Sequence, residues 1–177
     1  LAIGHNGNLT NAFGLRKNLV ERGCIFQSTM DTEIIIHLIA ISLYSTVVDR
    51  IIDALKQVQG AYSLVAMTKD SLIGVRDPMG VRPLVLGMFD NAYILCSETC
   101  ALDIIGADYV RDIDPGEIVV ISEEGLRSIK PFSRQQKRFC IFEYIYFARP
   151  DSLVEGRNVY DVRKRIGKEL AKENKVE

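Results

Sequence analysis

The hydrophobic period of this chain changes near residue 60, and that change most limits the folds open to it. Upstream, apolar residues recur at helical spacing, whereas downstream short apolar runs alternate with brief polar links such as Lys69-Asp70 and Glu123-Glu124-Gly125. Links of this length join antiparallel neighbours, because a crossover between parallel strands takes a dozen or more residues. Helices gathered early and antiparallel strands gathered late predict an α+β fold, in which helices pack on sheets.

The same patterns place the individual elements. We expect helices over 10–23, 31–41, 46–60, 99–105 and 159–175, and strands over 61–68, 72–76, 82–88, 92–97, 108–112, 117–121 and 126–130. Residues 1–4 have the pattern of a strand that runs into a turn at Asn6-Gly7. The aromatic stretch 139–147 is expected to form a long strand, and 150–158 a loop.

Charge and composition exclude several classes of protein. The 177 residues carry 22 Lys or Arg and 23 Asp or Glu, with the two signs interspersed, whereas a nucleic-acid-binding protein would need a basic face. No apolar run approaches the roughly 20 residues that a membrane-spanning helix requires. The four cysteines stand in a chain without secretory signs, so we expect reduced thiols and a cytoplasmic protein.

The first candidate for chemistry is His5-Asn6-Gly7-Asn8. Asn-Gly is a turn signal, because both residues tolerate positive φ. Alternatively, the Asn6 carboxamide and the Gly7 backbone N–H converge on one point and form the donor pair that stabilises a tetrahedral oxyanion. The motif alone does not decide between a turn and an oxyanion hole.

A second candidate is Asp31, in the step Asp31-Thr32-Glu33. An acidic residue that opens a helix is favoured by capping and by the helix dipole. The functional interpretation is a carboxylate that binds the α-ammonium group of an amino-acid substrate. Both uses can coexist in one residue.

A third motif is Arg76-Asp77-Pro78-Met79-Gly80-Val81-Arg82-Pro83-Leu84. Asp-Pro-x-Gly is typical of a β-turn that joins two strands. The whole nine-residue order is harder to obtain from turn chemistry alone. We assign this segment to the fold around a site, without direct chemistry.

Together these three motifs resemble the class II glutamine amidotransferases, which use an N-terminal nucleophile. Segments 97–101, 114–117 and above all Phe142-Glu143-Tyr144-Ile145-Tyr146-Phe147-Ala148-Arg149-Pro150-Asp151-Ser152 resemble one branch of that family. In this branch the ammonia released from glutamine passes to phosphoribosyl pyrophosphate, at the start of purine synthesis. The resemblance covers nearly the whole chain.

The resemblance implies a fold and a set of roles. It implies an Ntn-hydrolase-like αββα sandwich of antiparallel sheets between helical layers, incomplete at the N-terminus. Asn6 and Gly7 match the oxyanion hole of the family, and Asp31 matches its glutamine-binding acid. The nucleophilic cysteine of the family precedes His5 and does not lie in this chain, so we expect a piece of a larger enzyme that alone hydrolyses no glutamine.

It also implies a domain division, cofactors and partners. We expect a glutaminase domain over 1–138 without its first strands, followed over 139–177 by a junction strand and the first helix of a phosphoribosyltransferase domain. Mg²⁺ and phosphoribosyl pyrophosphate would bind in the part beyond this chain, and the intact protein would form a homo-oligomer. Cys140 matches a ligand of the [4Fe-4S] cluster found in some relatives, but a cluster takes four ligands, and a buried core cysteine is the alternative.

Two other functions stay open. One is a class II amidotransferase with a different ammonia acceptor, and the other is a degenerate, non-catalytic module that keeps a glutamine pocket. All versions with a glutamine site require the groups at 6 and 7 to share a cavity with Asp31.

Overall fold

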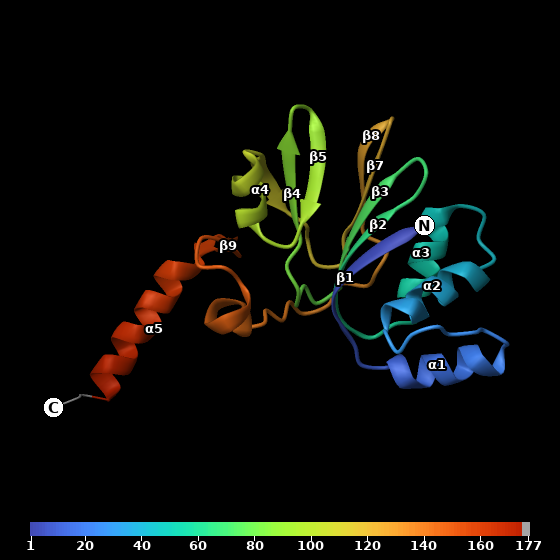
Figure 1. The fold of residues 1–177 in the computed structure, drawn as a ribbon, viewed down its shortest axis with the longest axis horizontal. Coiled ribbons are helices and arrows are strands. Elements are labelled where there is room, and N and C mark those ends of the chain that lie inside the picture. The colour runs from blue at the N-terminus through green and yellow to red at the C-terminus, as the bar shows by residue number, and fades with distance from the viewer. Residues whose placement is uncertain (175–177) are drawn as a thin grey trace.

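The structure is a computed structural model, and it describes residues 1–174 of the 177. Four layers follow one another in Figure 1, where helices lie at both outer sides and two sheets lie between them. The first sheet has the strand order β1-β2-β3-β7-β8, and the second has the order β5-β4-β6. Every pairing within these two sheets is antiparallel, so the predicted αββα sandwich is confirmed.

The strands of the first sheet are β1 (Ala2–Leu9), β2 (Gly60–Met67), β3 (Leu72–Arg76), β7 (Ile118–Ser122) and β8 (Gly125–Ile129). Those of the second are β4 (Val85–Phe89), β5 (Ala92–Cys96) and β6 (Asp108–Asp112). Helices α1 (Ala12–Glu21), α2 (Thr32–Ile41) and α3 (Val47–Leu55) cover the first sheet, and α4 (Thr99–Ile105) covers the second.

Two cores pack against the first sheet, one on each of its faces, and the period-2 alternation of its strands builds both. In β2, Tyr62 and Leu64 point toward the helices and pack with residues such as Leu38, while Val65 points toward the second sheet. The core between the sheets is centred on Leu84, Leu86, Ile113 and Val119. The central strands β2, β3 and β7 are buried on both faces and are apolar on both sides, as the short apolar runs of the sequence predict.

The C-terminal segment forms a smaller unit beside the sandwich. It contains a π-helical turn, η1 (Glu143–Phe147), the hairpin strands β9 (Leu153–Val154) and β10 (Arg157–Asn158), and helix α5 (Val159–Glu173). Tyr144, Ala148, Val154 and Val159 make a third small core within it. In Figure 1, α5 runs away from both sheets toward the C-terminus. Residue 175 of the predicted last helix lies outside the described residues.

Two predictions about local structure are wrong. Asn6-Gly7 is not a turn but the middle of β1, because β1 pairs with β2 in one unbroken register from Ala2 to Leu9. The stretch 139–147 is not a strand: Glu143 and Tyr144 are buried and the next three residues are exposed, a pattern that does not alternate.

Smaller differences concern boundaries. The strand expected over 82–88 begins only at Val85, since the backbone N–H groups of Val81 and Arg82 bind the Asp77 carboxylate instead of a neighbouring strand. The expected loop 150–158 contains the two-residue strands β9 and β10. The Thr46 hydroxyl accepts a hydrogen bond from Asp49 N at 3.1 Å, so the predicted start of α3 is confirmed.

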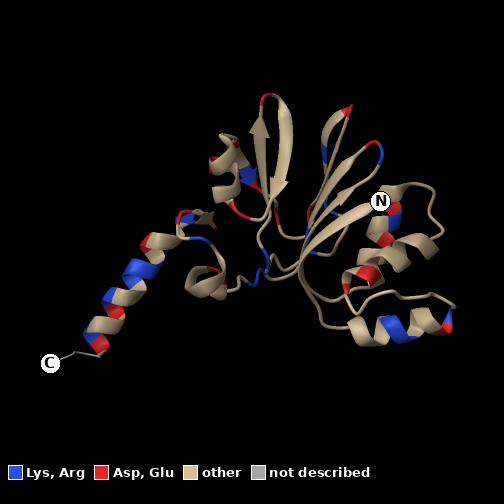
Figure 2. Cartoon of the chain, viewed as in Figure 1, with Lys and Arg blue, Asp and Glu red and all other residues tan. Residues whose placement is uncertain are grey.

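Acidic and basic residues mix along α5 and occur together in the loops in the view of Figure 2. Within residues 1–174, the helices are all too short or too polar to cross a lipid bilayer.

Glu117 connects the two sheets through a buried carboxylate. Its side chain is 2% exposed and binds the Arg111 guanidinium at 2.7 and 2.9 Å, the Ser128 hydroxyl at 2.6 Å and the Asp114 backbone N–H at 2.7 Å. Burial opposes ionisation of Glu117, but the hydrogen bonds from Arg111, Ser128 and Asp114 outweigh it and lower the pKa of this carboxyl.

We therefore expect Glu117→Gln to lower the free energy of unfolding by about 3 kcal/mol at pH 7, because Arg111 loses its charged partner. A lowered folded pKa gives stability that is present above the ordinary value of 4.5 and is lost as the pH falls through the folded pKa. The variant should therefore lose less stability than the parent below about pH 4.5, as measured by urea unfolding at several pH values. Glu124→Gln, at an exposed carboxylate, is the control, and an equal effect of the two substitutions would contradict this account.

Candidate active site

The side chain of Asn6 points from β1 toward the second sheet and is bound on both ends. Its Nδ2 donates to the Ser97 hydroxyl at 3.1 Å, just beyond β5. Its Oδ1 accepts from Arg82 Nη2 at 2.6 Å and from Arg82 Nε at 3.1 Å. The carboxamide is therefore held in one orientation by groups from two distant segments.

The backbone N–H of Gly7 points the other way, out of the edge of the first sheet. Antiparallel partners alternate between hydrogen-bonded and non-bonded pairs. Thr10 N donates to Gln59 O at 2.8 Å, and the register then makes the pair of Gly7 and Tyr62 a non-bonded one. The Tyr62 carbonyl supports this assignment, because it accepts a hydrogen bond from Asp77 N on the side of β2 that faces away from β1. Since β1 ends the strand order, the Gly7 N–H faces an edge that no described strand covers.

Asp31 lies at this same edge. Its Oδ2 accepts from the backbone N–H of Leu9 at 2.9 Å, which is the next outward-facing N–H after that of Gly7. Asp31 precedes α2 as its N-cap, but its side chain makes no capping hydrogen bond. The predicted helix-opening position is thus confirmed, while the carboxylate serves β1 instead. An open hollow of about 290 Å³, lined in part by Phe13, Arg16 and Thr29, adjoins it.

His5 lies on the face of β1 that is turned toward α2, and its ring approaches Asp31. Its Nδ1 lies 3.0 Å from the Thr32 hydroxyl and 3.4 Å from Asp31 Oδ1, and its side chain is 4% exposed. Burial lowers the pKa of His5 although Asp31 opposes that shift, which favours a neutral ring at pH 7. Its buried Nε2 has no hydrogen-bond partner among the described residues. The sequence motif contained His5 but suggested no role for it.

The structure thus brings together some predicted groups and separates others. The Gly7 N–H and the Asp31 carboxylate share the open edge of β1, whereas the Asn6 side chain lies on the face turned toward the second sheet. The split arises because side chains of a strand project from the faces of the sheet, whereas its backbone N–H groups lie in the plane of the sheet and point to its edges.

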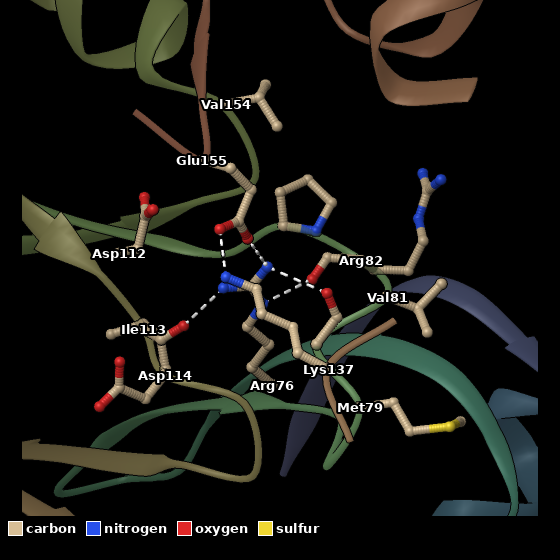
Figure 3. A network of polar contacts seen from close by, with 12 residues as sticks. Arg76, Met79, Val81, Arg82, Asp112, Ile113, Asp114, Lys137, Val154 and Glu155 are labelled. Carbon is tan, nitrogen blue, oxygen red and sulfur yellow. Dashed lines mark hydrogen bonds and ion pairs between the residues drawn. The ribbon is translucent and has the colours of Figure 1, made fainter. Parts of the chain in front are cut away.

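The motif at 76–84 supports this arrangement from between the sheets. Asp77, Pro78, Met79 and Gly80 form the predicted β-turn, with Gly80 N donating to Asp77 O at 2.9 Å. Arg76 is 3% exposed. Its guanidinium donates to the carbonyls of Gly80, Arg82 and Ile113 at 2.8 to 3.1 Å and to Glu155 at 2.8 Å. Figure 3 shows these bonds meeting at Arg76, with Lys137 also paired with Glu155.

Two contacts around Asn6 were not predicted from the sequence. Arg82 Nη1 lies 2.8 Å from the Glu143 carboxylate in η1, so Arg82 joins Asn6 to the C-terminal segment. Ser97, which holds the other end of the Asn6 amide, also had no predicted role of its own. No local pattern reveals contacts between residues so far apart in the chain.

Cys140 is half-buried and its thiol is free. Within residues 1–174, no three His, Cys, Asp or Glu side chains are grouped closely enough to hold a metal ion. These residues do not by themselves fit an iron–sulfur cluster, which needs four ligands.

Comparison with known proteins gives one family. The protein-family sequence model described as a glutamine amidotransferase domain matches residues 1–103. The chain is 53% identical to the amidophosphoribosyltransferase of Rhizobium etli and 46% identical to that of Bacillus subtilis, in each case over 100% of this chain and 37% of the relative.

A solved structure agrees with these relatives. The structure described as glutamine phosphoribosylpyrophosphate amidotransferase from B. subtilis, complexed with ADP and GMP, superposes with a TM-score of 0.96 at 45% identity. The superposition covers 99% of this chain and 39% of that one. The chain therefore spans well under half of the proteins it resembles.

The backbone at position 7 requires glycine. Gly7 has φ +152°, and an added Cβ would lie 2.0 Å from Ala61 O on β2. Gly4, in the same strand, has its nearest such neighbour, Val65 O, at 3.9 Å. The two glycines form a matched pair for testing this contact.

We expect Gly7→Ala to destabilise the protein by about 3 kcal/mol or more, because β1 would have to move away from β2. Gly4→Ala should stay within about 0.5 kcal/mol of the parent. Urea unfolding followed by circular dichroism measures both. Equal stability of the two variants would mean that β1 accommodates a side chain at position 7.

Proposed function

The chain belongs to the family of glutamine amidotransferase domains, and on that basis we propose that it is the glutamine-hydrolysing part of an amidophosphoribosyltransferase. In the proposed reaction glutamine is hydrolysed, and its ammonia displaces pyrophosphate from phosphoribosyl pyrophosphate to give phosphoribosylamine. The observation that carries the proposal is the 53% identity to a named amidophosphoribosyltransferase over the whole of this chain. That identity extends beyond the family match at 1–103, into the segment that distinguishes ammonia acceptors, and so favours phosphoribosyl pyrophosphate over another acceptor.

The roles follow the geometry of β1. The Gly7 N–H and one N–H of Asn6 Nδ2 would donate to the oxyanion that forms on the carboxamide carbon of glutamine. Asp31, at the same edge as Gly7, would bind the α-ammonium group of the substrate through a charge-assisted hydrogen bond. Asn6 would join them without leaving its contacts, through the Nδ2 hydrogen that Ser97 does not engage, so we place the oxyanion where the face of β1 turned toward the second sheet meets its open edge.

The nucleophile of the proposal is a cysteine whose own α-amine acts as the base. Cys24, Cys96, Cys100 and Cys140 all lie inside the chain, where the α-nitrogen is part of a peptide bond. The nucleophile must therefore be supplied by a residue other than these four.

The remaining parts of the proposal concern the intact protein. We assign residues 1–138 to the glutaminase domain and 139–177 to the junction with a phosphoribosyltransferase domain, an assignment supported by the separate small core around Tyr144 and Val159. Mg²⁺ would assist displacement of pyrophosphate there, and Cys140 would be one ligand of an iron–sulfur cluster if the other ligands come from that part. We propose a cytoplasmic homo-oligomer, in keeping with four free thiols.

The test compares two ammonia sources in the intact protein. We expect Asn6→Ala to lower kcat of the glutamine-dependent reaction by about 100-fold or more, because an oxyanion donor acts in the transition state. We expect Asp31→Asn to raise KM for glutamine by about 10- to 100-fold through a weakened charge-assisted hydrogen bond. Steady-state assays with glutamine and with ammonium chloride measure both effects.

Neither substitution should change the reaction with ammonium chloride, and Asp70→Asn, at an exposed turn, should change neither reaction. A parent protein that makes no phosphoribosylamine from either source would refute the proposed function. Equal losses with glutamine and ammonia would refute the roles of Asn6 and Asp31.

A further inference from the structure

We propose that Arg82 is a positioning residue for glutamine hydrolysis, which fixes the Asn6 carboxamide and links its orientation to η1 through Glu143. The inference rests on the proposed function, because it assigns Asn6 an oxyanion to stabilise. It adds a residue that does not touch the substrate but determines which atoms of Asn6 do.

The contacts of Asn6 leave one orientation for its amide. Both Arg82 nitrogens within reach are donors, and a guanidinium has no acceptor, so the atom that faces Arg82 must be Oδ1. Nδ2 is then directed toward the Ser97 hydroxyl, and its second hydrogen is left for a ligand. Without Arg82 the amide could rotate by half a turn and present an acceptor where the oxyanion needs a donor.

Arg82 is itself fixed from several sides. Its backbone N–H binds the Asp77 carboxylate at 3.3 Å, and its carbonyl accepts from Arg76 Nε at 2.9 Å. Its guanidinium carries an ion pair to Glu143 at 2.8 Å and lies 5.0 Å from the centre of the Phe147 ring. The turn therefore sets where the side chain starts, and η1 sets where its charged end lies.

The buried Glu143 carboxylate depends on its ion pair with Arg82 as much as the Arg82 guanidinium does. Its side chain is 2% exposed, and Arg82 is the charged partner 2.8 Å away. Burial raises the pKa of Glu143 by more than the nearby Arg82 lowers it, so the ionised form depends on Arg82. A buried carboxylate is stable only beside a compensating charge, so η1 and Arg82 hold each other in place.

The link continues to helix α5. Arg163 in α5 donates to the carbonyls of Tyr144 at 2.6 Å and Ala148 at 2.8 Å, the first within η1 and the second just after it. A series of contacts thus runs from α5 through η1, Glu143 and Arg82 to Asn6. A displacement of α5 would reach the Asn6 carboxamide through this series.

The substitution Arg82→Lys tests whether Arg82 acts by positioning Asn6 or only through its positive charge. Lysine keeps one positive charge but has a single nitrogen, which cannot make both the two hydrogen bonds to Asn6 and the ion pair with Glu143 that Arg82 makes. In the intact enzyme we expect Arg82→Lys to lower kcat for glutamine hydrolysis by about 10- to 100-fold, with KM for glutamine within about 3-fold of the parent. The reaction with ammonium chloride should be unchanged.

The matched control is Arg111→Lys. Arg111 also makes a two-bond ion pair, with Glu117, but lies in β6 outside the proposed site. The Arg111→Lys substitution should lower the urea midpoint of unfolding while leaving kcat for glutamine unchanged. A comparable kcat loss in Arg111→Lys would mean that general destabilisation explains the effect, and would overturn the inference.

A second variant keeps the test decisive if Arg82→Lys does not fold. Glu143→Gln preserves the shape of the partner but removes its charge, and we expect a 3- to 10-fold fall in kcat for glutamine at unchanged KM. Unaltered kcat in the folded Arg82 or Glu143 variant, beside a large loss in Asn6→Ala, would overturn the inference and leave the proposed function standing. A parent enzyme without glutamine-dependent activity would overturn both.

Discussion

The rest of the structure depends on how Arg76 and Asp77 satisfy the backbone of the segment between the sheets. That segment is buried yet irregular, so its polar groups have no strand to pair with and would be costly to leave unbonded. The Asp77 carboxylate accepts from the N–H groups of Met79, Val81 and Arg82, and the Arg76 guanidinium donates to the carbonyls of Gly80 and Arg82. Two side chains thereby convert a loop into a rigid support, and the position of Arg82 follows from it.

Local patterns predicted most of the fold, because most elements are set by burial of their own residues. The core-facing spacing of α3 and the apolar runs of β2, β3 and β7 are visible without knowledge of their partners. The stretch 139–147 failed for the opposite reason. Its aromatic residues are typical of strands, but Glu143 pairs with Arg82 and the Tyr144 hydroxyl donates to Val154 O, and these distant contacts favour a helical turn.

The candidate site divides in the same way. Asn6, Gly7 and Asp31 were identified from motifs, yet only the strand pairing shows that two of these groups lie at an edge and the third on a face. The sequence suggested a turn at Asn6-Gly7 because glycine permits one, whereas here glycine permits close contact between β1 and β2. His5, Arg82 and Ser97 make their contacts across the fold, so residue type and spacing gave no signal for them.

The two arginines of the motif also explain why the C-terminal segment stays attached to the sandwich. Arg76 reaches Glu155 in the β9–β10 hairpin, and Arg82 reaches Glu143 in η1. Three of these four side chains are less than a fifth exposed, so separation would leave buried charges without partners, a far larger cost than loss of a surface pair. Since the same motif fixes the support of Asn6, the segment that leads into α5 and the candidate glutamine site must move together or lose these pairs together.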